Sequence, residues 1–381
     1  MHINEIKIEN FRNIDFMGIF PHKEINVIYG QNGQGKTNLL EAIWLFTGCK
    51  SFRNSKDSEL VQFNSENSKI SMSFETTLRE NNVSIFIDKK RTANLNGINL
   101  SSPRELIGKY YAVVFSPIHL SLIKDGPLNR RKFIDTAISQ IDNMYAKKLM
   151  YFNHLIQQKN ALLKNAAENP SLLDTLDIWD EKIALAGADV ICDRIDYIKK
   201  LQVKATEIYH GISGEKEELG IKYLSNVRYE SEKKSDIAKI YFNNMVKNRP
   251  NDLYLKNTTS GPHRDDIEIL INNISARKFG SQGQQRSASL ALKLGEAEII
   301  KDLKGEHPII LLDDVMSELD STRQNYILNK MTDKQVFITC CEKETISRLH
   351  AGKVFKVDCG KVVDWCIWIS GRTQLFVTKI F

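Results

Sequence analysis

The segment Gly30-Gln31-Asn32-Gly33-Gln34-Gly35-Lys36-Thr37 matches the phosphate-binding pattern GxxxxGK[ST]. It follows a strand-like segment, 25–29, and opens a predicted helix over 36–47, which is the context that a P-loop requires. Glycines let backbone N–H groups converge on a β-phosphate, and the positive end of the helix adds to the attraction. Lys36 can bridge the β- and γ-phosphates, and the Thr37 hydroxyl can bind Mg²⁺. The segment predicts a site for ATP and Mg²⁺.

Two aspartates end a buried strand near the other end of the chain. Four apolar residues, 309–312, are followed by Asp313 and Asp314. Many strands end in such a turn, so the pattern alone is weak. Beside a P-loop, however, the first carboxylate can bind Mg²⁺ and the second can polarise the attacking water. We therefore predict Asp313 as a metal ligand and Asp314 as a catalytic residue.

A second glycine motif precedes a predicted helix over 285–303. It reads Ser281-Gln282-Gly283-Gln284. Ser281 can simply cap the helix. Alternatively, the serine, the glycine and the helix N-terminus form an anion site that completes the nucleotide pocket of a neighbouring molecule. The sequence leaves both interpretations open.

Strand-like patterns lie at both ends of the chain and helical patterns lie between them. Asn96-Gly97 predicts a two-residue hairpin turn, and apolar residues recur at helical spacing over 130–164 and 172–210. The pattern predicts an α/β fold: a P-loop ATPase head built from 1–127 and 251–361. A helical arm, 128–250, is inserted. The tail, 362–381, is atypical, and we expect either an added edge strand or partner surface, or a disordered or artefactual segment.

The composition is that of an ordinary globular protein. The chain has 381 residues, 42% of them hydrophobic and 26% charged, and a net charge of +6, which excludes a wholly disordered chain. No apolar run approaches the roughly 20 residues of a membrane span. Six cysteines without a CxxC pair are typical of reduced thiols. With a charged N-terminal segment, these features predict a cytoplasmic protein.

The order of the motifs resembles the RecF family, in the SMC-like branch of the ABC-type ATPases. The resemblance spans residues 1 to about 361. Besides the motifs above, it is carried by IENFRNI (8–14), VVFSP (113–117), IKDGPLNRRKFID (123–135), SGPHRDD (260–266) and LLDDVMSELD (311–320).

This resemblance implies an ATP-dependent DNA-binding protein for recombinational repair of single-strand gaps, replication recovery and the SOS response. Such a protein binds gaps or junctions of single- and double-stranded DNA and helps load recombinase with RecR and RecO. ATP would join two subunits head to tail, with each nucleotide between Gly30–Thr37 of one chain and Ser281–Gln284 of the other. Residues 317–320 would lie at that interface, and Arg12 is a further nucleotide contact. Weak, DNA-stimulated ATP hydrolysis would serve as a switch.

Two positions depart from the wider ABC pattern. Thr339-Cys340-Cys341 stands where a switch histidine is usual, and Asp314 replaces the usual glutamate. Because aspartate is one methylene shorter, we expect slow hydrolysis. The Q-loop glutamine has no clear counterpart, and Ser116 and Gln62 are the candidates.

The remaining motifs allow more than one interpretation. The basic clusters Arg130-Arg131-Lys132 and Lys89-Lys90-Arg91 can contact DNA phosphates or be solvated. His263 is either a nucleotide contact or, more simply, a hydrogen-bonded structural residue. Among rival functions, a chromosome-structuring SMC ATPase is disfavoured by the short arm, and a transporter ATPase subunit by the long helical insert. A metabolic P-loop kinase would have no use for the second glycine motif.

Overall fold

The computed structural model describes residues 1–381 except 167, 317–318, 332, 342–350, 370–371 and 375–381. Contacts divide the chain into two compact units. The head unit consists of Met1–Leu120, Glu207–Lys216 and Ser289–Phe381. The arm unit consists of Ser121–Thr206 and Glu217–Ala288.

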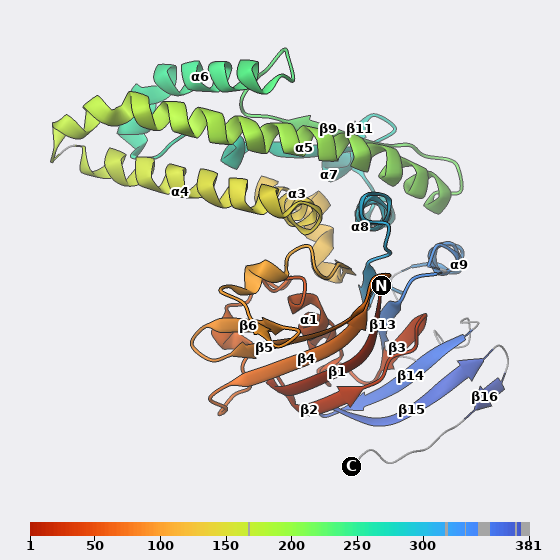
Figure 1. Cartoon of the computed structure of the whole chain (residues 1–381). Coiled ribbons are helices and arrows are strands. Elements are labelled where there is room, and N and C mark those ends of the chain that lie inside the picture. Colours follow the sequence, from red (N-terminus) through yellow and green to blue (C-terminus); the bar gives the residue numbers. More distant parts are fainter. Residues whose placement is uncertain (167, 317–318, 332, 342–350, 370–371, 375–381) are drawn as a thin grey trace. The chain divides into compact units, whose positions relative to one another are not determined.

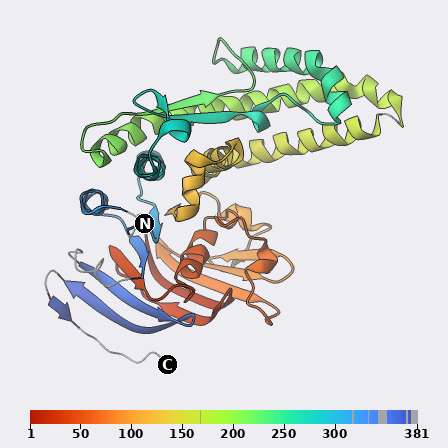
Figure 2. The ribbon, with the colours of Figure 1, turned by 180° about the vertical axis from the view of Figure 1, so that it is seen from behind.

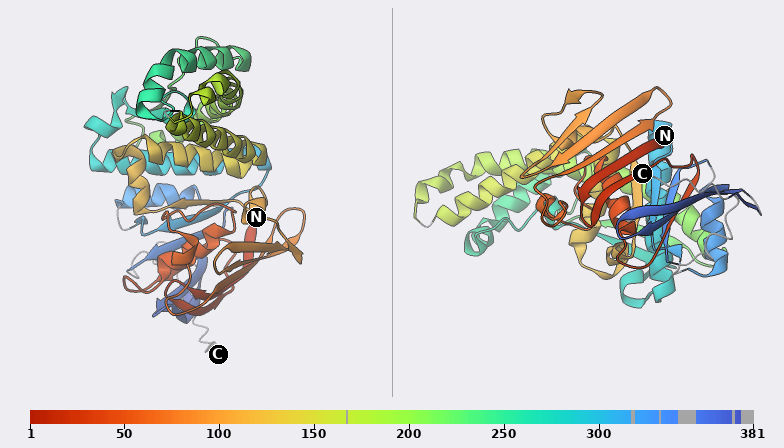
Figure 3. Two further views of the ribbon diagram at one scale, coloured as in Figure 1. Left: turned by 90° about the vertical axis from the view of Figure 1, so that its left-hand side faces the viewer. Right: turned by 90° about the horizontal axis from the view of Figure 1, so that it is seen from below.

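The first sheet of the head unit is antiparallel and has the strand order β2-β1-β4-β5-β6-β7. Figure 3 shows these strands side by side, from red to orange. Their bounds are β1 His2–Phe11, β2 Ile14–Ile19, β4 Ser68–Glu75, β5 Glu80–Ile87, β6 Arg91–Leu95 and β7 Ile98–Asn99. The Asn96-Gly97 hairpin is confirmed, with positive φ at both residues (53° and 84°), as this turn type demands.

The second sheet of the head unit has the order β16-β15-β14-β3-β13-β12-β8. Its strands are β3 Ile25–Tyr29, β8 Ala112–Phe115, β12 Ile309–Asp313, β13 Val336–Cys340, β14 Ala351–Asp358, β15 Lys361–Ile369 and β16 Arg372–Gln374. Five of them, β14, β3, β13, β12 and β8, run parallel. These five strands are largely buried apolar runs, as expected for a parallel sheet.

Helix α1 (Lys36–Leu45) joins the two sheets of the head unit. It contacts β1 of the first sheet and β8, β12 and β13 of the second. Leu39, Leu40 and Ile43 lie in one core cluster with Ile6 of β1 and Leu311 of β12. Because α1 is buried on most sides and packs against both sheets, these contacts hold the helix in place at the end of the P-loop. Helices α8 (Gln282–Lys304) and α9 (Ser321–Asn329) and the short 3₁₀ segments η1 Asp57–Glu59, η2 Pro103–Leu106 and η3 Pro117–Leu120 complete this unit.

The arm unit combines helices with a small antiparallel sheet, β11-β10-β9. Figures 1 and 2 show its long helices α4, α5 and α6 running alongside one another. The elements are α2 Ser121–Lys124, α3 Pro127–Ile141, α4 Asn143–Asn165, η4 Pro170–Thr175, α5 Leu176–Ile212, β9 Leu219–Leu224, α6 Lys234–Leu255, η5 Pro262–Arg264, β10 Asp266–Ile271, β11 Ile274–Ser275 and α7 Ala276–Phe279. The last residues of α5 and most of α8 belong to the head unit.

The helical region differs from the sequence expectation in two places. The predicted helix over 130–164 is interrupted at Asp142, whose carboxylate accepts the Met144 N–H (2.8 Å) and caps α4. Helix α6 lies outside the two segments in which helical spacing was found, 130–164 and 172–210. It buries few side chains and contains Pro250, so its periodic signal is weak.

The unit boundaries also differ from the predicted ones. Residues 251–288 group with the arm unit, since β10 pairs with β9 from Asp266↔Leu224 to Ile271↔Leu219. Strand β15 occupies 361–369, most of it in the segment expected to be an atypical tail, and pairs with β14. Val362 and Trp365 pack against the head core. Up to Ile369, the structure therefore agrees with the edge-strand alternative.

A buried ionic cluster connects the three long helices of the arm unit. Lys159 of α4 is 0% exposed, and its Nζ lies 2.7 Å from Asp180 of α5 and 3.2 Å from Asp252 of α6. Both carboxylates are buried as well, and Asp180 has a second cation partner in Arg249 of α6 (2.8 Å). Lys159 is therefore the cation that compensates Asp252 and shares the compensation of Asp180.

We expect Lys159→Ala to lower the free energy of unfolding by about 3–5 kcal/mol, because the buried Asp252 would lose its counter-charge and the buried Asp180 would keep only Arg249. Lys148→Ala on the same helix is the control: its ion pair with Asp193 is partly exposed, and its loss should cost about 1 kcal/mol or less. Urea unfolding followed by far-UV circular dichroism measures both. Equal effects would contradict the assigned role of the cluster.

Candidate nucleotide-binding site

The predicted site residues of the head unit meet at the carboxyl ends of parallel strands. The P-loop follows β3, Asp313 ends β12, and Thr339 lies near the end of β13, which pairs with both β3 and β12. Ligands of parallel α/β sheets bind at this edge. The strand order therefore brings together residues that are about 280 positions apart in the chain.

The backbone of the P-loop depends on its glycines. Gly33 and Gly35 have φ values of 81° and 106°, a left-handed region that glycine adopts without steric cost. At Gly30 an added Cβ would lie 2.2 Å from the Val357 carbonyl oxygen of β14. Any side chain at residue 30 would therefore displace the neighbouring strand.

Lys36 points back over the P-loop. Its buried Nζ donates to the carbonyl oxygens of Gly30 and Gln31 (3.0 Å for Gln31) and lies 3.4 Å from the Cys341 Sγ. The ammonium group is thus surrounded by the loop whose N–H groups would hold phosphate. This position suits a cation that bridges phosphate oxygens.

The predicted metal-side residues form a connected group. The Thr37 hydroxyl donates to the Asp313 Oδ1 (2.8 Å), and the Thr339 hydroxyl donates to the same oxygen (2.9 Å). Burial raises the pKa of Asp313, partly offset by these two hydrogen bonds. A hydroxyl and a carboxylate are hard oxygen donors, as Mg²⁺ prefers. Mg²⁺ would be held by Thr37 and Asp313, and it would supply charge neutralisation on the phosphates.

Thr339 is a site residue whose role sequence reasoning missed. Its Oγ1 also accepts the Asp314 backbone N–H (2.9 Å), so one hydroxyl orients both aspartates. Asp314 itself has a φ of 54°, a left-handed conformation that is uncommon for residues other than glycine, that aspartate adopts more readily than most, and that occurs often at functional sites. The signal in the sequence was its motif position, since Thr339-Cys340-Cys341 stands where a switch histidine is usual.

Arg12 lies beside the P-loop but is engaged elsewhere. Its guanidinium contacts both oxygens of the fully buried Glu41 of α1 (3.0 and 2.9 Å) and the Glu59 carbonyl (2.9 Å). The neighbouring Asn13 donates to the Gly33 carbonyl (2.9 Å). In this structure Arg12 therefore supports α1 and the P-loop, and its contact with a nucleotide stays a prediction.

The turn between β14 and β15 is hydrogen-bonded to the P-loop at Gln34. The Gly360 N–H donates to the Gln34 carbonyl (2.9 Å), and the Cys359 N–H donates to the Gln34 side chain. The turn lies just before the segment expected to be atypical, so the last strands of the head support the nucleotide site.

The second glycine motif caps α8 in the arm unit. The Ser281 Oγ accepts the Gln284 N–H (3.2 Å), and the Gln284 Oε1 accepts the Ser281 N–H (2.8 Å), a reciprocal capping box. Gln284 also donates to Glu217 (2.7 Å). Ser281 and Gln282 are exposed, and Gly283 follows them on the first turn. Capping is present, and it leaves the helix N-terminus accessible.

Several other predicted residues have structural partners. Arg130 is buried against Asp266 (2.7 and 2.9 Å), and the half-buried Arg131 donates to the Asp265 carbonyl, so in this basic cluster Lys132 alone is exposed. The His263 Nε2 contacts the Thr258 carbonyl (3.0 Å), and burial lowers the His263 pKa to about 4. This geometry is that of a structural histidine.

The Q-loop candidates lie in different places. Ser116 directly follows β8, whose Phe115 pairs with Leu312, so it is next to the Asp313 end of β12. Gln62 instead donates to Asp15. Ser317 and Glu318 of the predicted interface segment fall outside the described residues.

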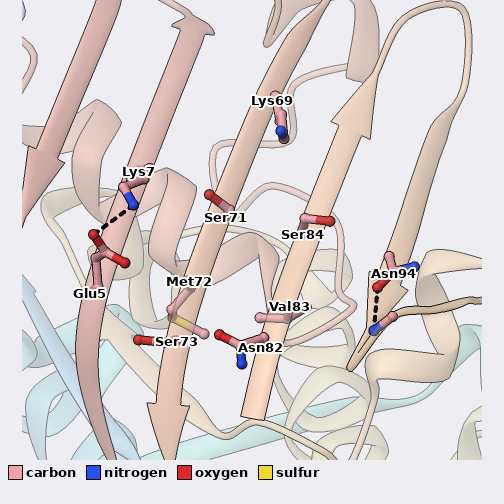
Figure 4. Close-up of a pocket in the computed structure, with 11 residues that line it drawn as sticks. Glu5, Lys7, Lys69, Ser71, Met72, Ser73, Asn82, Val83, Ser84 and Asn94 are labelled. Atoms are coloured by element: carbon pink, nitrogen blue, oxygen red, sulfur yellow. Dashed lines mark hydrogen bonds and ion pairs between the residues drawn. The ribbon is translucent and has the colours of Figure 1, made fainter.

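One hollow, with a volume of about 320 Å³, lies on the outer face of the first sheet. Its lining is mixed, including Glu5 and Lys7, which pair at 2.8 Å, and hydroxyl and amide side chains of β4, β5 and β6 (Figure 4). It contains no nucleophile–base pair.

Two further kinds of feature are absent from the described residues. No group of three or more His, Cys, Asp or Glu side chains is arranged to hold a metal ion. None of the helices has the length and apolar character that a membrane span requires.

The mixed α/β head carries a P-loop and paired aspartates at one sheet edge, and the inserted arm carries a capped glycine motif. These features define an ABC-type ATPase of the SMC-like class. The head domain of a Pyrococcus furiosus Smc protein shares the fold (TM-score 0.54, 15% identity, 94% of each chain). The family described as "RecF/RecN/SMC N terminal domain" matches residues 2–104.

The similarity to RecF proteins covers nearly the whole chain. DNA replication and repair protein RecF of Clostridium tetani is 38% identical over 368 residues, 96% of this chain and 100% of that protein. RecF of Lachnospira eligens is also 38% identical, over 96% and 99%. The solved structure of the recombination mediator protein RecF with ATP in the RecFOR pathway has a TM-score of 0.88 and 39% identity, over 94% of this chain and 96% of that one. The chain belongs to the RecF family of DNA replication and repair proteins.

Proposed function

We propose that this protein is an ATP-driven switch that binds gapped DNA during recombinational repair. The observation that carries the proposal is the group formed by Thr37, Asp313, Thr339 and Asp314 beside the P-loop. The Thr37–Asp313 hydrogen bond supports a metal-binding role for this pair, and Asp314 adds a second carboxylate at the same strand edge. Family membership favours this function over a chromosome-structuring or transporter ATPase.

Each residue has a distinct task in the switch. Backbone N–H groups of Gly33–Thr37 bind the β-phosphate, and Lys36 bridges the β- and γ-phosphates. Thr37 and Asp313 hold Mg²⁺, and Asp314 orients the attacking water. Because the aspartate side chain is short, hydrolysis is slow, and the ATP-bound state lasts long enough to act as a signal.

The second glycine motif acts on a neighbouring subunit. Its exposed serine and the N–H groups at the start of α8 attract phosphate. Two chains joined head to tail would each offer Ser281–Gln284 to the nucleotide held by Gly30–Thr37 of the other. ATP thereby creates a homodimer, and hydrolysis releases it.

DNA recognition depends on shape and charge and not on base sequence, since no helix-turn-helix or zinc-finger element is apparent in the sequence. The solved relative is placed in the RecFOR pathway, and we extend to this chain the partners RecR and RecO, loading of recombinase, a role in the SOS response and a cytoplasmic location. The preferred DNA is a junction of single- and double-stranded segments.

Binding of a labelled gapped duplex, measured by fluorescence anisotropy with the Asp314→Asn protein, tests the proposal. We expect binding about tenfold or more tighter with ATP than with ADP, because only the γ-phosphate can close the pocket between two subunits. Equal affinities with the two nucleotides would reject the ATP switch. No binding in either state would reject the DNA partner.

A further inference from the structure

An exposed basic patch precedes the second glycine motif in the arm unit. Residues 269–288 contain three basic and no acidic residues. Two of the three, Arg277 and Lys278, lie on the short helix α7 and are exposed. No carboxylate within this stretch offsets the two charges.

A third cation joins the patch from another part of the sequence. Helix α7 contacts α2, and the Arg277 Nε donates to the Lys124 carbonyl at the end of α2 (3.2 Å). Lys124 is exposed. Within the described part of the chain, Lys124, Arg277 and Lys278 have no carboxylate at ion-pairing distance. Their charges are thus available to an outside anion.

The nearby acidic residues do not neutralise the patch. Asp125, which follows Lys124, accepts a hydrogen bond from Asn129 (3.0 Å). Glu217 accepts one from Gln284 of the glycine motif (2.7 Å). Neither Asp125 nor Glu217 forms an ion pair with the three cations of the patch in the described part of the chain.

An aromatic side chain accompanies the three cations. Phe279, the last residue of α7, is 74% exposed. An exposed ring of this kind, beside lysine and arginine, has the composition of a surface that holds a phosphate backbone and stacks on an unpaired base.

We propose that Lys124, Arg277, Lys278 and Phe279, here called the α7 patch, bind the single-stranded part of gapped DNA. This inference rests on the proposed function and adds the place of contact. The three cations bind successive phosphates, and Phe279 stacks on a base.

The α7 patch has a direct connection to the nucleotide switch. Only Gly280 separates Phe279 from Ser281, whose side chain caps α8. The Gln285 side chain also donates to the Ala276 carbonyl of α7 (2.9 Å, buried), so α7 and the start of α8 are held together. DNA bound to α7 therefore orders the motif that contacts the partner's nucleotide.

The test compares three variants with the unmodified chain, each with a slowly hydrolysed ATP analogue and labelled single-stranded, duplex or gapped DNA. Arg277→Ala/Lys278→Ala should bind all DNAs about tenfold more weakly and reduce the slope of log K against log salt by about 2. Phe279→Ala should weaken single-stranded and gapped DNA by about tenfold and leave duplex unchanged. The matched control, Lys239→Ala/Lys247→Ala, removes two exposed lysines of α6 and should change binding less than twofold.

The outcomes separate this inference from the proposed function. If the unmodified chain binds gapped DNA and the α7 variants bind equally well, the α7 patch is not the contact. If the α7 and α6 double variants lose affinity alike, net charge explains binding and the inference fails. Solution mass with the ATP analogue should be unchanged in the α7 variants; a lost dimer would assign the patch to subunit contact instead. Absence of DNA binding by the unmodified chain would refute the proposed function itself.

Discussion

Replacing Lys36 by alanine should weaken ATP binding roughly 30- to 1000-fold, the range for removing one partner of a desolvated charge pair. The Lys36 Nζ is buried and bonded to the Gly30 and Gln31 carbonyls of the P-loop. No other described lysine or arginine has its charged group bonded to the loop in this way. Removing the ammonium leaves the phosphate oxygens without their bridging cation.

Calorimetric titration with ATP and Mg²⁺ measures the loss. Lys69→Ala, on the outer face of the first sheet, removes the same charge from an exposed position and should change affinity less than twofold. Lys36→Arg should restore little, because a planar guanidinium does not fit the position of an ammonium group. Affinity within threefold of the unmodified chain for Lys36→Ala would refute the assignment of the P-loop as the phosphate site.

The parts of the site that could be predicted from sequence are those in which residue type and local context act together. A strand, a glycine loop and a helix in direct succession determine the conformation of Gly30–Thr37. Asp313 could be added because parallel strands present their carboxyl ends at one edge. The Thr37–Asp313 hydrogen bond agrees with that reasoning.

The supporting contacts could not be predicted, because they join distant residues. Gln34 is held by Cys359 and Gly360, about 325 positions later. Arg12 has the motif position of a nucleotide contact, yet its partner here is Glu41, a buried acidic residue of α1. The pairing of these two charges depends on how β1 and α1 pack, and that packing is not encoded in either segment alone.

Charge runs were the least informative pattern in the sequence. Arg130 belongs to a dense basic cluster but is buried against Asp266, 136 positions away. The less dense pair Arg277 and Lys278 is exposed. Linear charge density does not distinguish an internal ion pair from a surface, because the deciding carboxylate can lie anywhere in the chain.

The second large effect concerns Ser281, which can be tested without disturbing its capping role. Aspartate and asparagine both serve as N-caps, so Ser281→Asp and Ser281→Asn should each keep α8 capped. In the ATP state only the aspartate would place a negative charge against the partner's γ-phosphate. Like charges in contact cost several kcal/mol, so we expect Ser281→Asp to weaken ATP-dependent dimerisation roughly 100-fold.

Light scattering of both variants, in the Asp314→Asn background with ATP and with ADP, measures this effect. Ser281→Asn should still double its mass with ATP, whereas Ser281→Asp should remain a monomer that binds ATP within about twofold of the parent protein. This selective loss would mean that the serine acts on the nucleotide of a second subunit, since its own P-loop is unaffected. If both variants form dimers equally, Ser281 only caps α8, and closure of the pocket in trans must be abandoned.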